Sequence, residues 1–206
     1  MKPDEPVLSP GMTTLTAWPD ADELSDVCLE GVDLSGMNLR AKELRGCVLR
    51  KCNLSGADLR QAGFVDVRLD RCDLSGANLE EAVFWRAELL SCRLTGADVI
   101  RGVWRSVRAQ GCKGDFLNLS ECKLERVSIA DTILREAAVE SCQLRQTDFT
   151  SCDLTRATFH RTPMKGMDMR ECILSGLIID IPDLRGMIVT PLQAADLSAL
   201  LGLVVR

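Results

Sequence analysis

The stretch Cys72-Asp73-Leu74-Ser75-Gly76-Ala77-Asn78-Leu79 holds two consecutive five-residue units, each with a leucine at its centre. Counting in fives from Leu74 reaches an apolar residue at almost every step, back to Leu24 and forward to Val189. The series contains 34 positions, and Gly114 is its only member without an apolar side chain. This regularity indicates that one inward-facing residue recurs every five residues along most of the chain.

A period of five fits neither an α-helix nor a flat strand. Five residues of an α-helix rotate the side chain by about 500°, so the leucines would point in all directions. In a strand, an odd step moves the side chain to the opposite face. The period instead predicts a backbone that turns a corner every five residues, and repeated corners in one sense produce a solenoid.

A second period of twenty residues sets the size of each coil. The tripeptide Leu-Ser-Gly occurs at 34–36, 54–56, 74–76 and 174–176. Twenty residues make four sides, so the sequence predicts an all-β, four-sided solenoid whose neighbouring coils pair in parallel about 4.8 Å apart. The 34 positions fill about 8 coils. We divide the chain into a tail or cap at 1–20, a β-solenoid at 21–190, and a C-terminal capping or dimerisation helix with its tail at 191–206.

Glycine and small residues follow the same phase. Gly56 and Gly76 stand two places after a centre, where a type II corner needs a positive φ that glycine adopts without strain. The position two places before each centre must be small, because it shares the interior with a large side chain. It is often alanine, and it is cysteine at Cys52, Cys72, Cys92, Cys112, Cys152 and Cys172.

These five-residue units resemble a known repeat. Ala57-Asp58-Leu59-Arg60-Gln61, Ala77-Asn78-Leu79-Glu80-Glu81 and Cys152-Asp153-Leu154-Thr155-Arg156 are similar to the A(D/N)LXX unit of pentapeptide-repeat proteins. The resemblance extends over residues 24–190 and implies a right-handed quadrilateral β-helix. It implies little about function, because this fold carries many roles.

Composition limits the binding partners and the cellular location that we expect for this chain. The net charge is −5 and the isoelectric point is near 5.0, which argues against direct binding of nucleic acid through its phosphates. No apolar run is long enough to span a membrane, and the N-terminus has no apolar signal segment, so we expect a cytoplasmic protein that binds no membrane. Cysteines stacked about 4.8 Å apart do not match disulfide geometry, so we expect reduced, buried thiols.

No residue set predicts catalysis. His160 is the only histidine, and its position after Phe159 places it on the outside. The sequence has no Cys-x-x-Cys pair and no glycine-rich phosphate loop. We therefore expect no enzyme activity, no metal and no cofactor.

One coil departs from the pattern. Trp104 stands at an inward position, and the next two centres are the small residues Ala109 and Gly114. One interpretation is volume compensation inside a packed coil. The alternative is that residues 108–115 bulge outward and Gly114 marks the distortion.

The two ends differ from the repeats. Four prolines at 3, 6, 10 and 19 mark residues 1–20 as a tail or cap, in which we expect the first ten residues to be mobile and Leu15 and Trp18 to cover the first coil. Thr190-Pro191-Leu192-Gln193 is a helix start, and the helix should run over 191–201 and stop at Gly202.

That helix is either a simple end cap or the interface of a homodimer. Ile179-Asp180 followed by a capped helix is similar to the C-terminal region of pentapeptide proteins of the quinolone-resistance type, and the resemblance implies a C-terminal dimer. The predicted interface residues are Leu192, Leu197, Leu200, Leu201 and Val204.

Outward apolar residues in the middle of the rod predict a partner site. A tryptophan among valines, bordered by arginine, has the composition of a protein-binding surface. The alternative is local packing of surface side chains. The predicted site residues are Val65, Val83, Trp85, Arg86, Val103 and Arg105.

The resemblance to quinolone-resistance proteins implies a non-enzymatic rod that binds DNA gyrase or topoisomerase IV and protects it from inhibitors by mimicking DNA. The other hypothesis is a general protein-interaction scaffold. A ladder of acidic and amide residues could imitate duplex phosphates, or its side chains could simply stack between coils: Asn38, Asp58, Asn78, Asp98 and Asn118.

Overall fold

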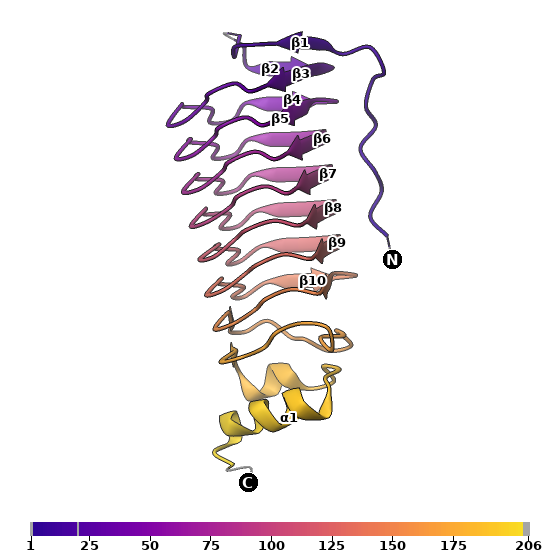
Figure 1. Ribbon diagram of the computed structural model, residues 1–206, viewed down its shortest axis with the longest axis vertical. Coiled ribbons are helices and arrows are strands. Elements are labelled where there is room, and N and C mark those ends of the chain that lie inside the picture. Colours follow the sequence, from indigo (N-terminus) through magenta and orange to yellow (C-terminus); the bar gives the residue numbers. More distant parts are fainter. Residues whose placement is uncertain (1, 20, 204–206) are drawn as a thin grey trace.

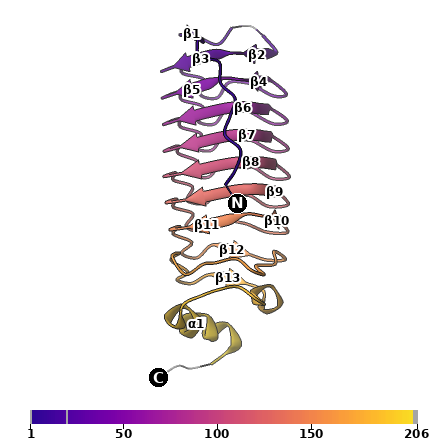
Figure 2. The ribbon, with the colours of Figure 1, turned by 90° about the vertical axis from the view of Figure 1, so that its right-hand side faces the viewer.

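The computed structural model describes residues 2–19 and 21–203, and it is a rod of stacked coils (Figure 1). About 8 turns of parallel β-solenoid are followed by a short C-terminal helix. In Figure 2 the chain crosses the near face from right to left while descending from the N-terminal coils, so the solenoid is right-handed. The predicted all-β, four-sided architecture is confirmed.

The strands lie along two sides of the rod, and the longest of them bend around the corner between those sides. Eleven strands form one parallel sheet, and β12 and β13 form a second. The elements are β1 (Thr13–Leu15), β2 (Glu23–Ser25), β3 (Val27–Glu30), β4 (Glu43–Arg45), β5 (Val48–Arg50), β6 (Gly63–Asp70), β7 (Val83–Leu90), β8 (Val103–Gln110), β9 (Lys123–Ala130), β10 (Gln143–Arg145), β11 (Asp148–Thr150), β12 (Thr158–Phe159), β13 (Ile178–Ile179), η1 (Ile181–Leu184), α1 (Pro191–Leu197) and η2 (Ser198–Leu201).

Each coil pairs with the next in a register of twenty residues. Leu69 of β6 lies beside Leu89 of β7, which lies beside Ala109 of β8. The other two sides are joined by isolated bridges in the same register, such as Asn78 with Asp98. Residues twenty apart therefore form columns that run along the rod, both inside and outside.

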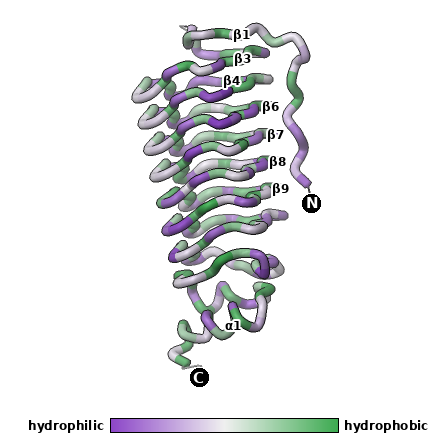
Figure 3. The backbone as a smooth tube through the Cα atoms, viewed as in Figure 1, coloured by the Kyte–Doolittle hydropathy of each residue, from purple (hydrophilic) through white to green (hydrophobic). Residues whose placement is uncertain are grey.

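The interior is filled by the predicted centres. All 34 are buried except Leu144, Leu184 and Val189, which are half-buried. Hydrophobic and hydrophilic residues consequently alternate along every coil (Figure 3). Inside, the rings of Phe64 and Phe84 stack with centroids 4.4 Å apart.

The corners use glycine less than the sequence suggested. From residue 26 to residue 166, every fifth residue has a positive φ, but most of these residues are not glycine. Asp66, Arg86, Ser106 and Arg126 are examples, with φ between 49° and 56°. Inter-coil hydrogen bonds on both sides of each corner hold this conformation against its local strain.

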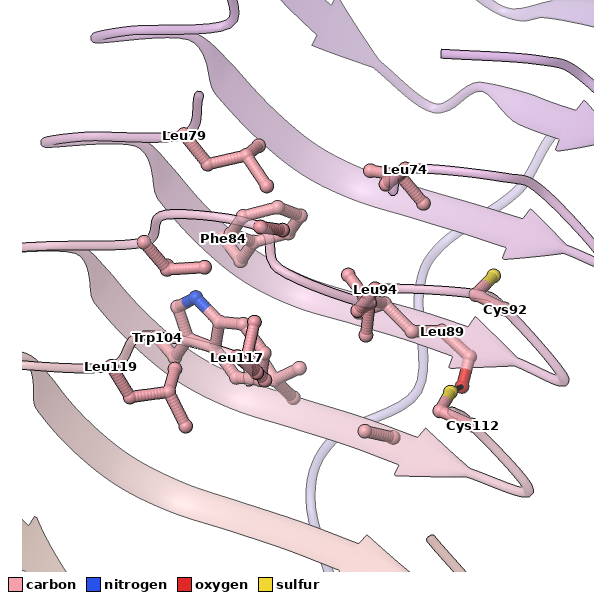
Figure 4. Close-up of a cluster of buried hydrophobic side chains, with 14 of the residues drawn as sticks. Leu74, Leu79, Phe84, Leu89, Cys92, Leu94, Trp104, Cys112, Leu117 and Leu119 are labelled. Carbon is pink, nitrogen blue, oxygen red and sulfur yellow. Dashed lines mark hydrogen bonds between the residues drawn. The ribbon is translucent and has the colours of Figure 1, made fainter. Parts of the chain in front are cut away.

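The coil of Trp104 confirms compensation and excludes the bulge. Trp104 is 2% exposed and lies under Phe84, with ring centroids 5.4 Å apart (Figure 4). Strand β8 is continuous and Lys113 bridges to Ile133, so residues 108–115 keep the register. Gly114 makes room for Leu117, because a Cβ on Gly114 would lie 3.3 Å from the Leu117 side chain and 3.1 Å from that of Leu134.

All ten cysteines are unpaired and buried, as predicted. One column of stacked cysteines consists of Cys52, Cys72, Cys92 and Cys112, and each of these thiols points at a backbone carbonyl of the preceding coil. Cys92 Sγ lies 3.4 Å from the Leu69 oxygen and Cys112 Sγ 3.3 Å from the Leu89 oxygen. The two thiols occupy matching places one above the other (Figure 4).

The N-terminal segment is not a free tail. Strand β1 pairs with β3 and begins the sheet, and Leu15 and Trp18 pack against the core at that end, as expected. Residues 2–10 then lie along the outside of the rod and cross β6, β7 and β8 (Figure 2). Residues 2–10, for which the sequence predicted mobility, make specific hydrogen bonds with the corners they cross. We call residues 2–10 the strap.

The C-terminal end has the predicted helix start. Thr190 accepts from the Gln193 N–H and completes a capping box. The α-helix ends at Leu197, earlier than expected, and a 3-10 helix, η2, continues to Gly202, which has the positive φ of a helix terminator. Gln193 Nε2 donates to the carbonyl oxygens of Met169 and Cys172, both at 2.8 Å, and so fastens the helix to the last full coils.

Candidate functional site

The six residues predicted as a partner site come together on one side of β6, β7 and β8. Val65, Trp85 and Arg105 form one outward column, in direct register. Val83 and Val103 form the parallel column two residues away, on the other side of the buried ring of Phe84. We call these five residues the Trp85 patch.

Exposure within the patch is graded. Trp85 is 45% exposed and Val83 is 40% exposed. Val65 and Val103 are half-buried beside them, and the exposed Arg105 closes the column with Glu125, whose Oε2 lies 3.6 Å from Arg105 Nε. An aromatic ring surrounded by valines and ended by an arginine is the composition found at the centres of protein interfaces.

The sixth predicted residue, Arg86, supports the patch from the corner. Its guanidinium lies 4.5 Å from the centroid of the Trp85 ring. Two of its nitrogens donate to the two carboxylate oxygens of Asp66, both at 2.6 Å. Arg86 therefore orients Trp85 and has little capacity left for a partner's carboxylate.

Asp66 joins the patch to the strap. Its Oδ1 also accepts the backbone N–H of Val7 at 2.9 Å. The hydrogen bonds from Arg86 hold the pKa of the Asp66 carboxyl below its usual range, against the opposing effect of partial burial. A chain of contacts thus runs from the strap through Asp66 and Arg86 to Trp85.

Strap contacts were not predicted from sequence. Asp4 Oδ2 accepts from Ser106 Oγ and from Arg126 Nη1, both at 3.0 Å, and Ser9 Oγ donates to Asp26 at 2.6 Å. These partners stand twenty residues apart or multiples of twenty, in the corner column. That spacing was the only sequence signal, and nothing in residues 2–10 shares it.

The acidic and amide ladder is used in local structure. Asp58 accepts from the Arg60 guanidinium at 2.8 Å and from the Arg60 backbone N–H, and these hydrogen bonds lower its pKa to about 2. Asn118 Nδ2 donates to Asp98 Oδ1 of the preceding coil at 3.1 Å. Turn formation and stacking between coils account for this ladder.

The predicted dimer residues divide into two groups. Leu192, Leu200 and Leu201 are exposed, whereas Leu197 packs against the core of its own chain and serves as a cap. Val204 lies outside the described residues. The same end exposes apolar residues that the sequence analysis did not select: Ile173, Ile178, Ile181 and Ile188.

His160, the single histidine of the sequence, takes part in local structure. His160 Nδ1 lies 3.0 Å from Asp180 Oδ1, and Asp180 also accepts the Arg161 N–H, so this pair fastens the start of η1. Within residues 2–19 and 21–203, no group of three or more His, Cys, Asp or Glu side chains is arranged to hold a metal ion. No helix in the same ranges is long and apolar enough to cross a membrane.

A four-sided parallel β-solenoid with one inward residue per five defines a class of repeat protein. The sequence matches the profile of the pentapeptide repeat region at residues 22–99 and 42–119, and that of pentapeptide repeats at residues 140–176. The matched residues make up more than half of the chain, which therefore belongs to the pentapeptide-repeat family.

Several solved structures are similar. HetL of Nostoc sp. strain PCC 7120, described as involved in the regulation of heterocyst differentiation, is 18% identical and superposes with a TM-score of 0.48, covering 81% of this chain and 86% of HetL. Full-length QnrB1, a plasmid-mediated fluoroquinolone resistance protein, is 20% identical with a TM-score of 0.42, covering 88% of this chain and 100% of QnrB1.

A pentapeptide repeat protein of the Arabidopsis thaliana thylakoid lumen is 27% identical with a TM-score of 0.45, covering 50% of this chain and 68% of that protein. Among curated proteins, none matches this chain significantly.

Proposed function

We propose that this chain is a rigid, non-enzymatic rod that binds a partner protein through the Trp85 patch. The observation that carries the proposal is the exposed Trp85 ring, held between a valine-lined surface and the guanidinium of Arg86. A fixed aromatic side chain loses little conformational entropy on binding, and such residues contribute most of the energy of protein interfaces.

The rod supplies the rigidity that such a site needs. The backbones of β6, β7 and β8 pair on both sides of the corner residues Asp66, Arg86 and Ser106, and their inward residues are buried. The patch therefore keeps its shape before a partner arrives, which favours docking without rearrangement.

We propose a type II topoisomerase, DNA gyrase or topoisomerase IV, as the first partner to test. The support is membership of the pentapeptide-repeat family together with a net charge of −5. A negatively charged surface suits an enzyme whose own substrate is the polyanion DNA. The alternative is a scaffold for a different protein, which the same patch would serve equally well.

The test is DNA supercoiling by purified gyrase with and without a fluoroquinolone. We expect the chain either to restore supercoiling in the presence of the drug or to inhibit the enzyme directly. Trp85→Ala should weaken this effect at least about tenfold, as expected for a central aromatic residue. Phe116→Ala is the matched control, because Phe116 is a comparably exposed aromatic residue that lies at a corner outside the Trp85 patch.

The outcomes separate the two hypotheses. No effect of the wild-type chain on either topoisomerase excludes the topoisomerase proposal and leaves the scaffold. Capture from a cell lysate then compares wild type with the Trp85→Ala and Phe116→Ala variants. Equal recovery of every bound protein by all three excludes the Trp85 patch as the docking surface.

We further propose that the C-terminal end pairs with a second copy of the chain. It carries a group of exposed apolar side chains on η1, α1 and η2, among which Leu192 is 76% exposed. Removing such a group from water favours association. Mass measurement in solution should give a dimer that Leu192→Glu with Leu201→Glu converts to a monomer, and a monomeric wild type would exclude the interface.

A further inference from the structure

The strap lies in a track formed by one corner of the rod. Its direction is opposite to the progress of the coils, so Ser9 meets Asp26, Val7 meets Asp66, and Asp4 meets Ser106 and Arg126. In Figure 2 the strap crosses β6, β7 and β8 near their middles, where these strands bend.

The spacing of an extended chain matches the spacing of the coils. Three extended residues span about 10 Å, and two coils also span about 10 Å. Asp4 and Val7 are three residues apart and bind corner residues two coils apart, Ser106 and Asp66. Any extended segment laid along this corner can therefore place a carboxylate and a backbone N–H on the same two partners.

Charge favours an acidic occupant. Arg126 binds Asp4, and Arg86 lies near enough to feel the charge of Asp4. Glu5 pairs with Lys2 of the strap itself at 2.7 Å and lies within weaker electrostatic reach of Arg108 and Arg68. On the rod, Arg86 is paired with Asp66, Arg68 and Arg108 share Glu88, and Asp26 and Asp148 also border the track. Among the described residues Arg126 pairs with no carboxylate except that of Asp4, so the track without the strap leaves this guanidinium open to an acidic occupant.

Each polar contact between the strap and the rod involves a side chain, either of the strap or of the rod. Within its described residues, no backbone-to-backbone hydrogen bond joins positions 2–10 to the coils. Val7 is 71% exposed, and the carboxylate of Asp4 is more than half exposed. Contacts of this kind are weak individually and exchange readily with those of a competing segment.

We propose that this corner is a docking track for an extended acidic segment of a partner protein, and that the strap occupies it in cis until such a segment displaces it. The recognised chemistry is a carboxylate, with a second one beside it that adds electrostatic attraction, and a backbone N–H three residues after the first. Prolines around the acidic pair help, since they keep the segment extended before it binds. This track adjoins the Trp85 patch through Asp66 and Arg86, but it binds its occupant through other residues, Ser106 and Arg126, and does not depend on the function proposed for the patch.

The test uses the full-length chain and a fluorescein-labelled peptide with the sequence of residues 2–10, followed by fluorescence anisotropy. Asp4→Ala with Glu5→Ala loosens the strap while leaving every corner residue intact. Because the competing strap lowers the fraction of open track, the double variant should bind the peptide at least about tenfold more tightly than wild type does.

Two controls locate the binding. A peptide with Asn and Gln in place of its two acidic residues should bind at least about tenfold more weakly. Adding Arg126→Ala to the double variant should weaken binding of the acidic peptide by a similar factor. Thermal unfolding of each variant checks that the rod is intact, since none of these residues lies in the core.

The inference is overturned if the double variant binds the peptide no better than wild type. Equal affinity for the acidic and neutral peptides, or affinity unaffected by Arg126→Ala in a folded chain, also overturns it. None of these results bears on the Trp85 patch, whose test uses other variants and another readout.

Discussion

The guanidinium of Arg86 lies over the indole ring of Trp85 and is held there by both carboxylate oxygens of Asp66. A cation over an aromatic face restricts the ring as well as attracting it. The relation explains how a tryptophan can be nearly half exposed and still have a defined orientation.

Removing Arg86 should free the Trp85 ring. We expect Arg86→Ala to increase quenching of tryptophan fluorescence by acrylamide, because Trp104 is buried, Trp18 is half-buried, and Trp85 dominates the accessible signal. Arg101→Ala is the control, since Arg101 pairs with Glu80 and Glu81 and, within the described residues, does not stack on a tryptophan ring as Arg86 does. Equal quenching in both variants would show that Arg86 does not restrain the ring.

Trp104 should be replaceable by phenylalanine at lower cost than by leucine. Trp104→Leu leaves a cavity in a tightly packed coil and should lower the free energy of unfolding by about 2–4 kcal/mol. The indole N–H of Trp104 is buried without a hydrogen-bond partner. Trp104→Phe removes that unpaired donor, which offsets part of the lost volume. Urea denaturation gives the free energy of unfolding of both variants. A lower value for Trp104→Phe than for Trp104→Leu would contradict this account.

Gly114 and Leu117 should show coupled effects. Gly114→Ala puts a methyl group against the Leu117 and Leu134 side chains and should cost about 1–3 kcal/mol of stability. Leu117→Ala in the same chain removes one of the two obstacles. The double variant should therefore be more stable than the sum of the single changes predicts, as a double-mutant cycle would measure. Simple additivity would mean that the two side chains do not compete for space.

The buried thiols should be unreactive in the folded chain. Burial raises the pKa of the Cys142 thiol from an ordinary 9.0 to about 11, and it also raises the pKa of Cys47 and Cys122. Thiolate is the reactive form, so Ellman's reagent at pH 8 should label no cysteine until denaturant is added, and all ten afterwards. Rapid labelling of the native chain would contradict the burial of the ladder.

The same shift predicts a loss of stability in alkali. Between pH 9.0 and about 11 the folded chain keeps the Cys142 proton that the unfolded chain has lost. Because the folded state then binds more protons, the free energy of unfolding falls as pH rises through this window. Cys142→Ala should flatten that part of the pH profile, and an unchanged slope would assign the loss to other groups.

The repeats were predictable because their physics is local and periodic. The recurrence of one inward residue per five predicted the coil, the register and the burial of residues such as Leu74 and Phe84. The capping box at Thr190 predicted where the C-terminal helix begins. The outward columns of Trp85 and Val83 follow from the same phase. These inferences needed only the spacing of residues along the chain.

What lay outside the period was not predictable. Asp4 and Ser106 are 102 residues apart and their contact depends on the strap turning back along the rod, which no spacing signals. The role of Arg86 was also missed. Its place next to Trp85 in the sequence suggested a charged residue at the edge of the partner site. Because Arg86 stands at a corner with a positive φ, its side chain instead binds Asp66.

The strap also makes the two halves of the rod unequal in how freely their length can change. Solenoids usually tolerate the gain or loss of a whole repeat, since each coil contacts only its neighbours. Residues 4–9 reach from Asp26 to Arg126, so the length of this segment fixes the number of coils that can lie between those two contacts. Twenty residues inserted between Asp26 and Arg126 would separate Asp4 from its partners. The same insertion beyond Arg126 would lengthen the rod and leave every contact of the strap in place.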